Sequence, residues 1–438
     1  MQRLHRQASR RIARLAALLA TAALLAGAAV AAAAAGDPDP SFGEGGFTTA
    51  SFDFQDPDLS AMAVDGEGRI VLGFDDLFAD DISDDFTLVR ILPDGELDSG
   101  FGGDGIVITD LGGNEGVRSL TIDREDRIIA AGYTYSLNPA ASLPLVRYLL
   151  DGTLDPSFGN GGIATGTVER SNPFITGFGA VDIDREDRIL ATGIGGGRKG
   201  VVRFDADGHV DGAFRQVDLD RAVGKRGGLS ALLAGPGGSV TVAGDDGHNA
   251  LVIRLRPNGT RDGRFGERGV RSYLGKPRSH VEDLALGERG RVIAVGSRDR
   301  LDGSGNGVDE FFVLRLRRHG EPDRSFARRG LVSLAFRCET GQGGCFANAT
   351  SVDVDSRGRV IAGGVATGAN ADNRRLALVR LTRNGQLDPS FRRAGMFLRN
   401  IGDLQNGLTD LDPLDRTVAA VDFQHDPSAN VTLGRFLP

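Results

Sequence analysis

Beyond residue 35, the chain alternates short runs of Val, Ile, Leu and Thr with turns rich in Gly, Asp and Pro. Residues 105–150 show the pattern clearly, with the successive runs GIVITD, VRSLTID, RIIAAG and LPLVRYLL. Runs of this composition bounded by Gly and Asp turns are typical of β-strands. The pattern therefore predicts four short strands in this segment.

A twelve-residue motif punctuates the strand pattern seven times. It reads DPDPSFGEGG at 37–46, DGELDSGFGGDG at 94–105, DGTLDPSFGNGG at 151–162, DGHVDGAF at 207–214, NGTRDGRFGERG at 258–269, HGEPDRSFARRG at 319–330 and NGQLDPSFRRAG at 384–395. Its phenylalanines, spaced 51 to 65 residues apart, are Phe42, Phe101, Phe158, Phe214, Phe265, Phe326 and Phe391. Four strands per repeat of this length describe one blade of a β-propeller.

The two chain ends are complementary parts of one repeat. The last repeat stops at VTLGRFLP, where the motif should follow, and residues 37–46 supply that motif at the start. We therefore predict an all-β, seven-bladed propeller with four strands per blade, closed by the N- and C-terminal part-repeats. It occupies residues 36–438 as a single domain, and closure removes open sheet edges.

Each motif aspartate follows an arginine by eight residues. The predicted pairs are Arg90/Asp98, Arg147/Asp155, Arg203/Asp211, Arg254/Asp262, Arg315/Asp323, Arg380/Asp388 and, across the closure, Arg435/Asp39. A cross-strand ion pair at a turn contributes about 0.2–1 kcal/mol, and burial of the motif phenylalanine between blades about 1.5–3 kcal/mol. Because the set recurs in every blade whereas an active site needs asymmetry, we interpret the motif as scaffold.

The repeats resemble the delta-60 repeat family of exported bacterial proteins. The resemblance rests on the pattern L-V-R-x-x-x-D-G-x-L-D-x-S-F-G-x-G-G, best matched at 155–162, and on a preceding D-x-x-G-R-I segment. It covers nearly all of residues 36–438 and implies a propeller-like repeat without implying a reaction. The chain has no Trp, which excludes the Trp-Asp ending of WD repeats and the usual Asp-box of sialidases.

Residues 1–35 have the composition of a secretory signal peptide. Five arginines precede an apolar Leu/Ala/Val run that ends in Ala33-Ala34-Ala35. An uncleaved membrane anchor is the alternative, since the run is nearly long enough to span a bilayer. We expect a secreted or periplasmic monomer that has no membrane span after cleavage.

The charge balance limits the partners. Loss of the leader's five arginines changes the formal net charge from −8 to −13, which argues against a nucleic-acid partner. We expect a protein or cell-envelope ligand. The two cysteines of the chain, Cys338 and Cys345, predict a local disulfide in an oxidising compartment.

The loops that connect the strands fall on two faces. The Asp-Gly and Gly-Arg turns are short and share one face, whereas the connections on the other face vary widely in length. Binding residues concentrate on variable loops. We place a candidate binding site in the acidic loop of the first blade, at Asp75, Asp76, Asp80, Asp81, Asp84 and Asp85. Clustered carboxylates could hold calcium, although the loop lacks the D-x-D-x-D-G order and a solvated acidic loop is commoner.

Catalysis finds little support in the sequence. The histidines beyond the leader (His209, His248, His280, His319 and His425) have no metal-site spacing, and no G-x-S-x-G elbow is present. We predict no catalytic residue, metal or cofactor, with calcium left open. The favoured function is a non-catalytic binding or scaffold propeller that uses its variable-loop face. The alternatives are a lyase or hydrolase that acts on a sugar or lactone, and a calcium-dependent surface protein.

Overall fold

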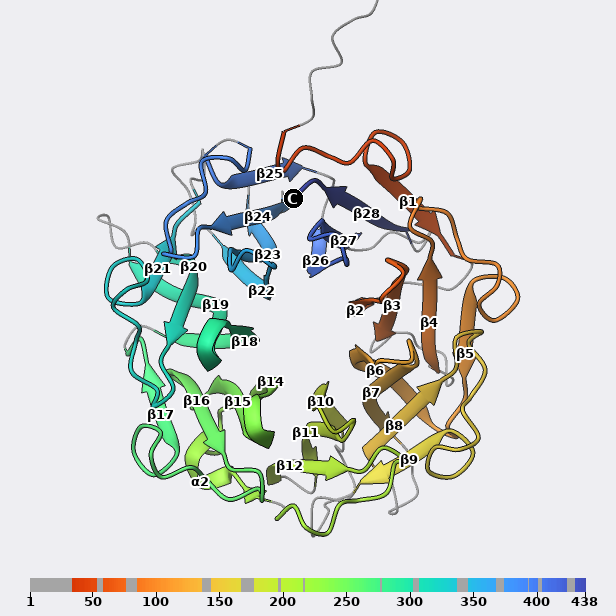
Figure 1. Cartoon of the computed structure of the whole chain (residues 1–438), viewed down its shortest axis with the longest axis horizontal. Helices are drawn as coiled ribbons and strands as arrows, with labels where there is room; N and C mark the ends of the chain where they lie inside the picture. The colour runs from red at the N-terminus through yellow and green to blue at the C-terminus, as the bar shows by residue number, and fades with distance from the viewer. Residues whose placement is uncertain are drawn as a thin grey trace, which may run out of the picture.

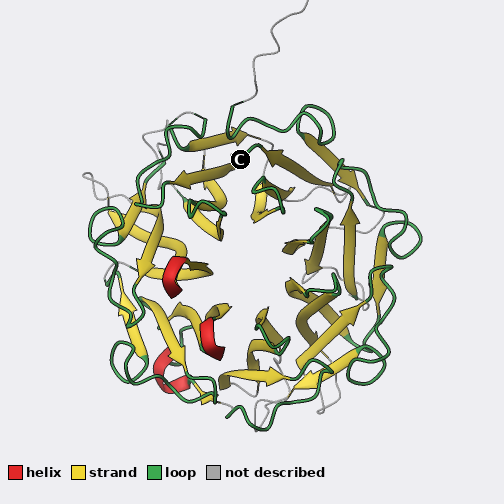
Figure 2. Ribbon diagram, viewed as in Figure 1, coloured by secondary structure: helices red, strands yellow, loops and turns green. Residues whose placement is uncertain are grey.

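The computed structural model describes residues 34–438 with internal gaps. The residues outside the description are 1–33, 53–57, 76–84, 136–142, 167–176, 196–197, 216, 276–277, 302–306, 337–345, 368–373, 393, 401–403 and 424–429. In the described part, seven antiparallel four-stranded blades surround a central channel (Figure 1). The ribbon is almost entirely strand and turn (Figure 2). The prediction of a seven-bladed β-propeller is confirmed.

In each of the first six blades the chain runs from the channel outward. The first three are β2 (Asp58–Val64), β3 (Ile70–Asp75), β4 (Phe86–Ile91) and β5 (Ile106–Thr109); β6 (Asn114–Ile122), β7 (Ile128–Tyr135), β8 (Leu143–Tyr148) and β9 (Ile163–Gly166); and β10 (Gly177–Ile183), β11 (Ile189–Gly195), β12 (Arg198–Phe204) and β13 (Val217–Asp218). The next three are β14 (Leu229–Ala234), β15 (Val240–Asp245), β16 (Ala250–Leu255) and β17 (Val270–Tyr273); β18 (Ser279–Gly287), β19 (Arg291–Leu301), β20 (Gly307–Leu316) and β21 (Leu331–Leu334); and β22 (Ala347–Val354), β23 (Val360–Thr367), β24 (Arg374–Leu381) and β25 (Met396–Asn400). A single pairing between Gly177 and Tyr133 joins the second and third blades.

The seventh blade is built from both ends of the chain, as predicted. β26 (Leu404–Leu411), β27 (Thr417–Phe423) and β28 (Asn430–Phe436) are followed outward by β1 (Phe47–Ser51). Before β1, Asp37 accepts a backbone hydrogen bond from Leu437 N at 2.9 Å, and the amide of Asp39 donates to Arg435 O at 2.7 Å. These bonds satisfy the edge of β28 and close the ring.

The turns separate the two faces of the ring. The connections from first to second strand are tight turns, and those from third to fourth strand carry the repeated motif with its Asp-Gly turn; both lie on one face, which we call the short-turn face. The other face, the variable-loop face, carries the second-to-third connections and the links from one blade to the next. α2 (Asp220–Val223) belongs to the link after the third blade. Among the described residues, no helix has the length and apolar character needed to cross a membrane.

The hydrophobic core lies between neighbouring blades. In one interface, Val295, Phe311 and Val313 of the fifth blade pack with Ala362 and Val379 of the sixth, all with at most 1% of their surface exposed. Burial of each Val or Phe side chain contributes about 1.5–3 kcal/mol. Alternation along each strand therefore fills two interfaces at once, one on each side of the blade.

All seven inner strands carry a β-bulge at the same level. The register against the second strand shifts at Ser60, Arg118, Gly179, Ser230, Glu282 and Thr350, and at residues 405–406 of β26. A bulge bends the strand and redirects a side chain. In the first six blades it brings the bulged residue to the wall of the channel.

Candidate functional site

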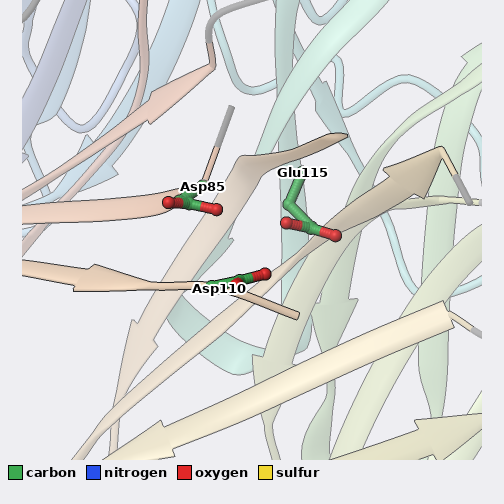
Figure 3. Close-up of side chains that lie close together, drawn as sticks. All are labelled: Asp85, Asp110 and Glu115. Atoms are coloured by element: carbon green, nitrogen blue, oxygen red, sulfur yellow. The ribbon is translucent and has the colours of Figure 1, made fainter. Parts of the chain in front are cut away.

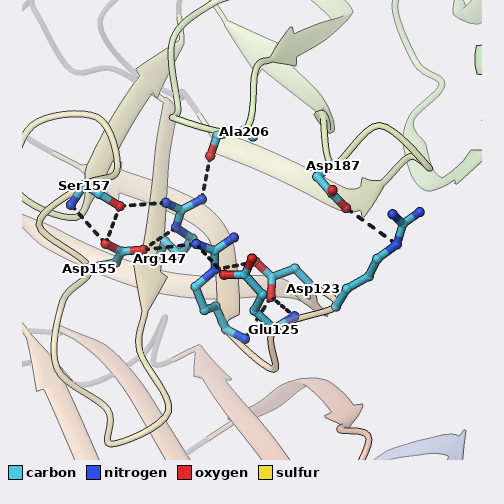
Figure 4. A network of polar contacts seen from close by, with 9 residues as sticks. Asp123, Glu125, Arg147, Asp155, Ser157, Asp187 and Ala206 are labelled. Atoms are coloured by element: carbon cyan, nitrogen blue, oxygen red, sulfur yellow. Dashed lines mark hydrogen bonds and ion pairs between the residues drawn. The ribbon is translucent and has the colours of Figure 1, made fainter.

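The repeated motif forms a polar network on the short-turn face. In the second blade, Arg147 Nε lies 2.8 Å from Asp155 Oδ2, and Arg147 Nη1 donates to Ala206 O of the third blade at 2.5 Å (Figure 4). Ser157 donates to Asp155 through its amide at 2.9 Å and its hydroxyl at 2.7 Å. The arginine therefore holds its own motif together and also links two blades.

Six of the seven predicted arginine–aspartate pairs lie in contact. Their N···O distances range from 2.7 to 3.0 Å, for Arg90–Asp98, Arg147–Asp155, Arg203–Asp211, Arg315–Asp323, Arg380–Asp388 and Arg435–Asp39. In the fifth blade, burial raises the pKa of Asp323, but hydrogen bonds from Ser325 and the charges of Arg315 and Arg291 outweigh it and lower the pKa to about 2. The carboxylates of these pairs therefore accept hydrogen bonds within the motif and have a structural role.

The fourth blade departs from the prediction. Arg254 donates to Thr241 Oγ1 at 2.8 Å and to Ser239 Oγ at 2.9 Å, while Asp262 lies 3.8 Å from Arg256. Where the first and sixth blades have a D-x-x-G-R turn, the fourth blade has Gly235 to Ser239, and the serine hydroxyl accepts a hydrogen bond from the guanidinium. The expected Arg254–Asp262 pair is therefore replaced by two hydrogen bonds from the guanidinium to uncharged hydroxyl groups.

The motif phenylalanines lie buried at the blade interfaces. Their exposed fractions are at most 3%, for Phe42, Phe101, Phe158, Phe214, Phe265, Phe326 and Phe391. The guanidinium of Arg147 lies 4.4 Å from the ring centroid of Phe158, a cation–π contact. Gly152 of the next turn packs on Phe101, where a Cβ atom would come within 2.9 Å of the ring at a φ of +85°. The positive φ and the close contact with the phenylalanine ring explain why the motif has a glycine at this position.

The predicted acidic site is only partly described. Asp76, Asp80, Asp81 and Asp84 lie outside the described residues, as do Cys338 and Cys345 of the predicted disulfide. Asp75 is 1% exposed, so it does not present a carboxylate to solvent. It accepts a hydrogen bond from the Tyr133 hydroxyl, and its Oδ2 lies 2.8 Å from Arg118 Nη1. Asp75 therefore holds Arg118.

Asp85, at the other end of the same loop, lies beside Asp110 and Glu115 (Figure 3). One carboxylate oxygen from each of the three lies within 4.8 Å of the others. Burial raises the pKa of Asp85 and of Glu115, and the charge of Asp110 adds to both shifts. Glu115 is fully buried and accepts a hydrogen bond from Thr134 at 3.0 Å. Oxygen ligands of this kind suit a calcium ion.

The inner strands enclose a cavity of about 700 Å³ in the central channel. All seven blades contribute to its wall, and the six bulged residues Ser60, Arg118, Gly179, Ser230, Glu282 and Thr350 all line it. Its wall includes Asp58 and Leu229, the first residues of β2 and β14, so the cavity lies toward the variable-loop face. A pocket of this volume accommodates a small-molecule ligand.

A second polar cluster flanks the cavity in the fifth blade. His280 Nε2 lies 2.8 Å from Glu282 Oε1, which also accepts a hydrogen bond from Asn348 Nδ2 at 2.9 Å. The hydrogen bond and charge of Glu282 raise the pKa of His280, against the effect of burial. The pKa of Glu282 is lowered, because the hydrogen bonds and charge of its partners outweigh burial.

Four aspartates lie on inner strands, in the half of each strand that leads to the short-turn face. Asp182, Asp283 and Asp410 accept hydrogen bonds from Ala234 N, Val352 N and Val64 N of the following blades, at 2.7 to 2.8 Å. Burial raises the pKa of Asp182 and Asp410 to about 6 and that of Asp283 to about 7. The fourth, Asp353, lies near Asp283 and Asp410, and its pKa is raised by burial and by their charges. Three of the four therefore serve as links between inner strands.

The comparisons with known proteins agree with this architecture. Residues 126–158 and 358–391 match a family model described as a "domain of unknown function (DUF5122) beta-propeller". Both segments begin in the turn after the inner strand and end at a motif phenylalanine. The match supports a β-propeller repeat family, whereas the delta-60 name stays a prediction. Among curated proteins, none matches significantly.

Several solved structures are similar to this chain over most of its length. A catalytically inactive virginiamycin B lyase from Staphylococcus aureus, solved with quinupristin, has a TM-score of 0.50 and 13% identity, with 90% of this chain and 99% of that chain covered. The polysaccharide lyase Uly1 has a TM-score of 0.46 and 8% identity, with coverage of 89% and 91%. The β-propeller domain of the Trilobed protease from Pyrococcus furiosus has a TM-score of 0.45 and 8% identity, with coverage of 87% and 94%. At these identities the likeness extends to the fold alone.

Proposed function

We propose that this chain is an exported, non-catalytic binding propeller whose ligand occupies the variable-loop face at the mouth of the channel. The cavity of about 700 Å³ carries the proposal. The repeated motif, in contrast, is committed to blade-to-blade contacts on the short-turn face. A rigid ring that offers one concave, asymmetric site at its centre is suited to binding.

The proposal includes the predicted partner and location. The leader-like residues 1–35 support export, and the ligand would be a protein or another component of the cell envelope. The formal charge of −8 for the full chain argues against nucleic acid. We expect the protein to work as a monomer, because radial repetition of blades leaves only short outer strands at the sheet edges.

Capture from envelope extract, with one face altered at a time, tests the proposal. The first bait carries Asp76, Asp80, Asp81 and Asp84 of the predicted acidic loop changed to Asn. The matched control carries Glu67→Gln, Glu125→Gln and Glu186→Gln, which are turn carboxylates of the short-turn face with 60 to 72% exposed side chains. Weaker capture and weaker direct binding by the first bait alone support the proposal. Equal capture by both, or loss with the control alone, would overturn the placement of the site.

An enzyme is the second candidate, favoured by the residues that converge on the channel. Arg118, Asp75 and Glu282 line the cavity, and Tyr133 and His280 contact them. Virginiamycin B lyase shows that a related fold can carry a lyase. Turnover of lactones and of anionic oligosaccharides tests this candidate, with Tyr133→Phe and Arg118→Ser compared through their kcat and KM. Absence of turnover across both classes argues against it.

A calcium-dependent surface protein is the third candidate. Its support is the group formed by Asp85, Asp110 and Glu115. Binding of calcium there would neutralise two carboxyls whose pKa values burial raises. The stabilisation by calcium described in the Discussion tests this candidate.

A further inference from the structure

The bulge level of the channel is a position at which the repeats can be compared directly. In three blades the bulged residue is Ser60, Ser230 or Thr350, and its hydroxyl donates to a backbone carbonyl of the following blade. Ser60, for example, donates to Val117 O at 2.5 Å. A hydroxyl that links inner strands is therefore the structural solution at this position.

The second and fifth blades replace that hydroxyl with opposite charges, Arg118 and Glu282. The ring does not need Arg118 for the link, because the neighbouring Ser119 Oγ accepts a hydrogen bond from Val181 N of the third blade at 3.1 Å. Charged groups in a partly enclosed channel are costly to desolvate. Of the blades that depart from the hydroxyl, these two carry charged residues, and both residues lie at the cavity wall, which points to a ligand.

Arg118 is presented to the cavity by the residues behind it. Asp75, 1% exposed, holds its Nη1 at 2.8 Å, and the guanidinium lies 5.1 Å from the ring centroid of Tyr133. The arginine side chain itself is 39% exposed. One edge of the guanidinium is thus fixed and other N–H groups remain for an anion, in the fork geometry that matches a carboxylate.

Glu282 is presented in a comparable way. His280 and Asn348 hold its Oε1, and its side chain is 27% exposed. Asp283, the next residue on β18, adds a second carboxyl group to the cavity wall on this side, whereas Asp58 lies on β2, the neighbour of β6. This side of the channel therefore favours a positively charged group, which in Figure 1 would lie across the channel from β6, near β18.

We propose, on the basis of the binding function above, that the cavity takes an amphoteric ligand such as an amino acid or a short peptide. Its carboxylate pairs with Arg118 and its ammonium group with Glu282. The third-blade bulge residue, Gly179, adds no side chain between these two groups. A cavity of about 700 Å³ is large enough for a peptide of a few residues.

Calorimetry with peptides of defined charge tests this inference. The full protein is titrated with a library of unmodified di- and tripeptides, and each binder is compared with its N-acetylated and C-amidated derivatives. We expect both blocked derivatives to bind at least about tenfold more weakly, which corresponds to one lost charge-assisted contact. Arg118→Ser should remove the preference for a free carboxylate alone, and Glu282→Ser the preference for a free ammonium alone.

Both substitutions restore the hydroxyl that other blades use. Because Arg118→Ser also leaves the buried carboxylate of Asp75 without its guanidinium partner, the melting temperature of each variant is measured beside its binding. Arg357→Ser, at an exposed turn position of the short-turn face, is the matched control and should bind like the wild type. Equal binding of blocked and unblocked peptides, wild-type affinity in both channel variants, or no peptide bound at millimolar concentration would each overturn the inference. The envelope capture reports independently on the binding function, so the two proposals can fail separately.

Discussion

Replacing Arg147 with Met removes one guanidinium while keeping much of the aliphatic volume. The arginine side chain is 3% exposed and that of its partner, Asp155, is 5% exposed. The substitution leaves Asp155 with the hydrogen bonds from Ser157 and with Arg127 at 3.7 Å. It also leaves Ala206 O without its donor across the blade interface. Removal of one partner of a buried ion pair costs about 3–5 kcal/mol.

The fourth blade supplies the matched control. Arg254 is 7% exposed, yet it donates hydrogen bonds to the uncharged hydroxyls of Thr241 and Ser239 in place of the ion pair. Burial lowers the pKa of Arg254, so its charge is poorly compensated. Arg254→Met therefore loses about 1–2 kcal/mol of hydrogen bonding and regains part of that from the removed charge. We expect it to destabilise the propeller far less than Arg147→Met.

The assay is urea unfolding followed by far-UV circular dichroism, because the chain has no Trp for fluorescence. A double-mutant cycle with Asp155→Asn isolates the pair. We expect the double variant to be more stable than the sum of the single losses predicts, by about 1.5 kcal/mol or more. Equal losses for Arg147→Met and Arg254→Met, or a coupling below about 0.5 kcal/mol, would refute the claim that the ion pair stabilises the ring.

Three further predictions concern Asp283, the carboxylate group of Asp85, Asp110 and Glu115, and the closure of the ring. Because the pKa of Asp283 is raised to about 7, the folded state holds a proton that the unfolded chain releases, so this contribution to stability is present near pH 5 and is lost as the pH rises through 7. The melting temperature should therefore be higher at pH 5 than at pH 8, and Asp283→Asn should reduce that difference. An unchanged difference in Asp283→Asn would contradict the assignment to this carboxyl. About 1 mM calcium should raise the melting temperature and chelator should reverse the effect in the wild type but not in Glu115→Gln, whereas an equal response in both excludes the carboxylate group as the site. Deletion of residues 36–51 exposes the edge of β28 and should produce dimers or aggregates on size exclusion, so a monomer with wild-type melting temperature would contradict ring closure.

The architecture was accessible from the sequence because its cause is local and repeated. The arginine, aspartate, phenylalanine and glycine of the motif recur at fixed spacing, and each has the same contact in nearly every blade. Closure could be predicted because VTLGRFLP and DPDPSFGEGG are complementary parts of one repeat. The exception, Arg254, depends on Ser239 in a different turn, and a comparison of motifs alone does not bring those two residues together.

The candidate site was less accessible because it is assembled from distant segments. Arg118, Asp75 and Glu282 are separated by tens to hundreds of residues, and the bulges that direct them inward have no simple sequence signature. A usable signal did exist, since the bulge level holds Ser or Thr in three blades and opposite charges in two others. The acidic loop was singled out for its density of aspartates, yet the structure shows Asp75 supporting Arg118 from a buried position.

The claim that the ligand occupies the channel on the variable-loop face can be tested with the chain's own methionines. Beyond Met1, the sequence has only Met62, which lines the cavity, and Met396, in the outer strand of the sixth blade. Uniform replacement with photo-methionine therefore places one reactive group inside the site and one internal control outside it. Irradiation in the presence of envelope extract, followed by mass spectrometry, should give a ligand adduct at Met62. Adducts confined to Met396 would contradict the account.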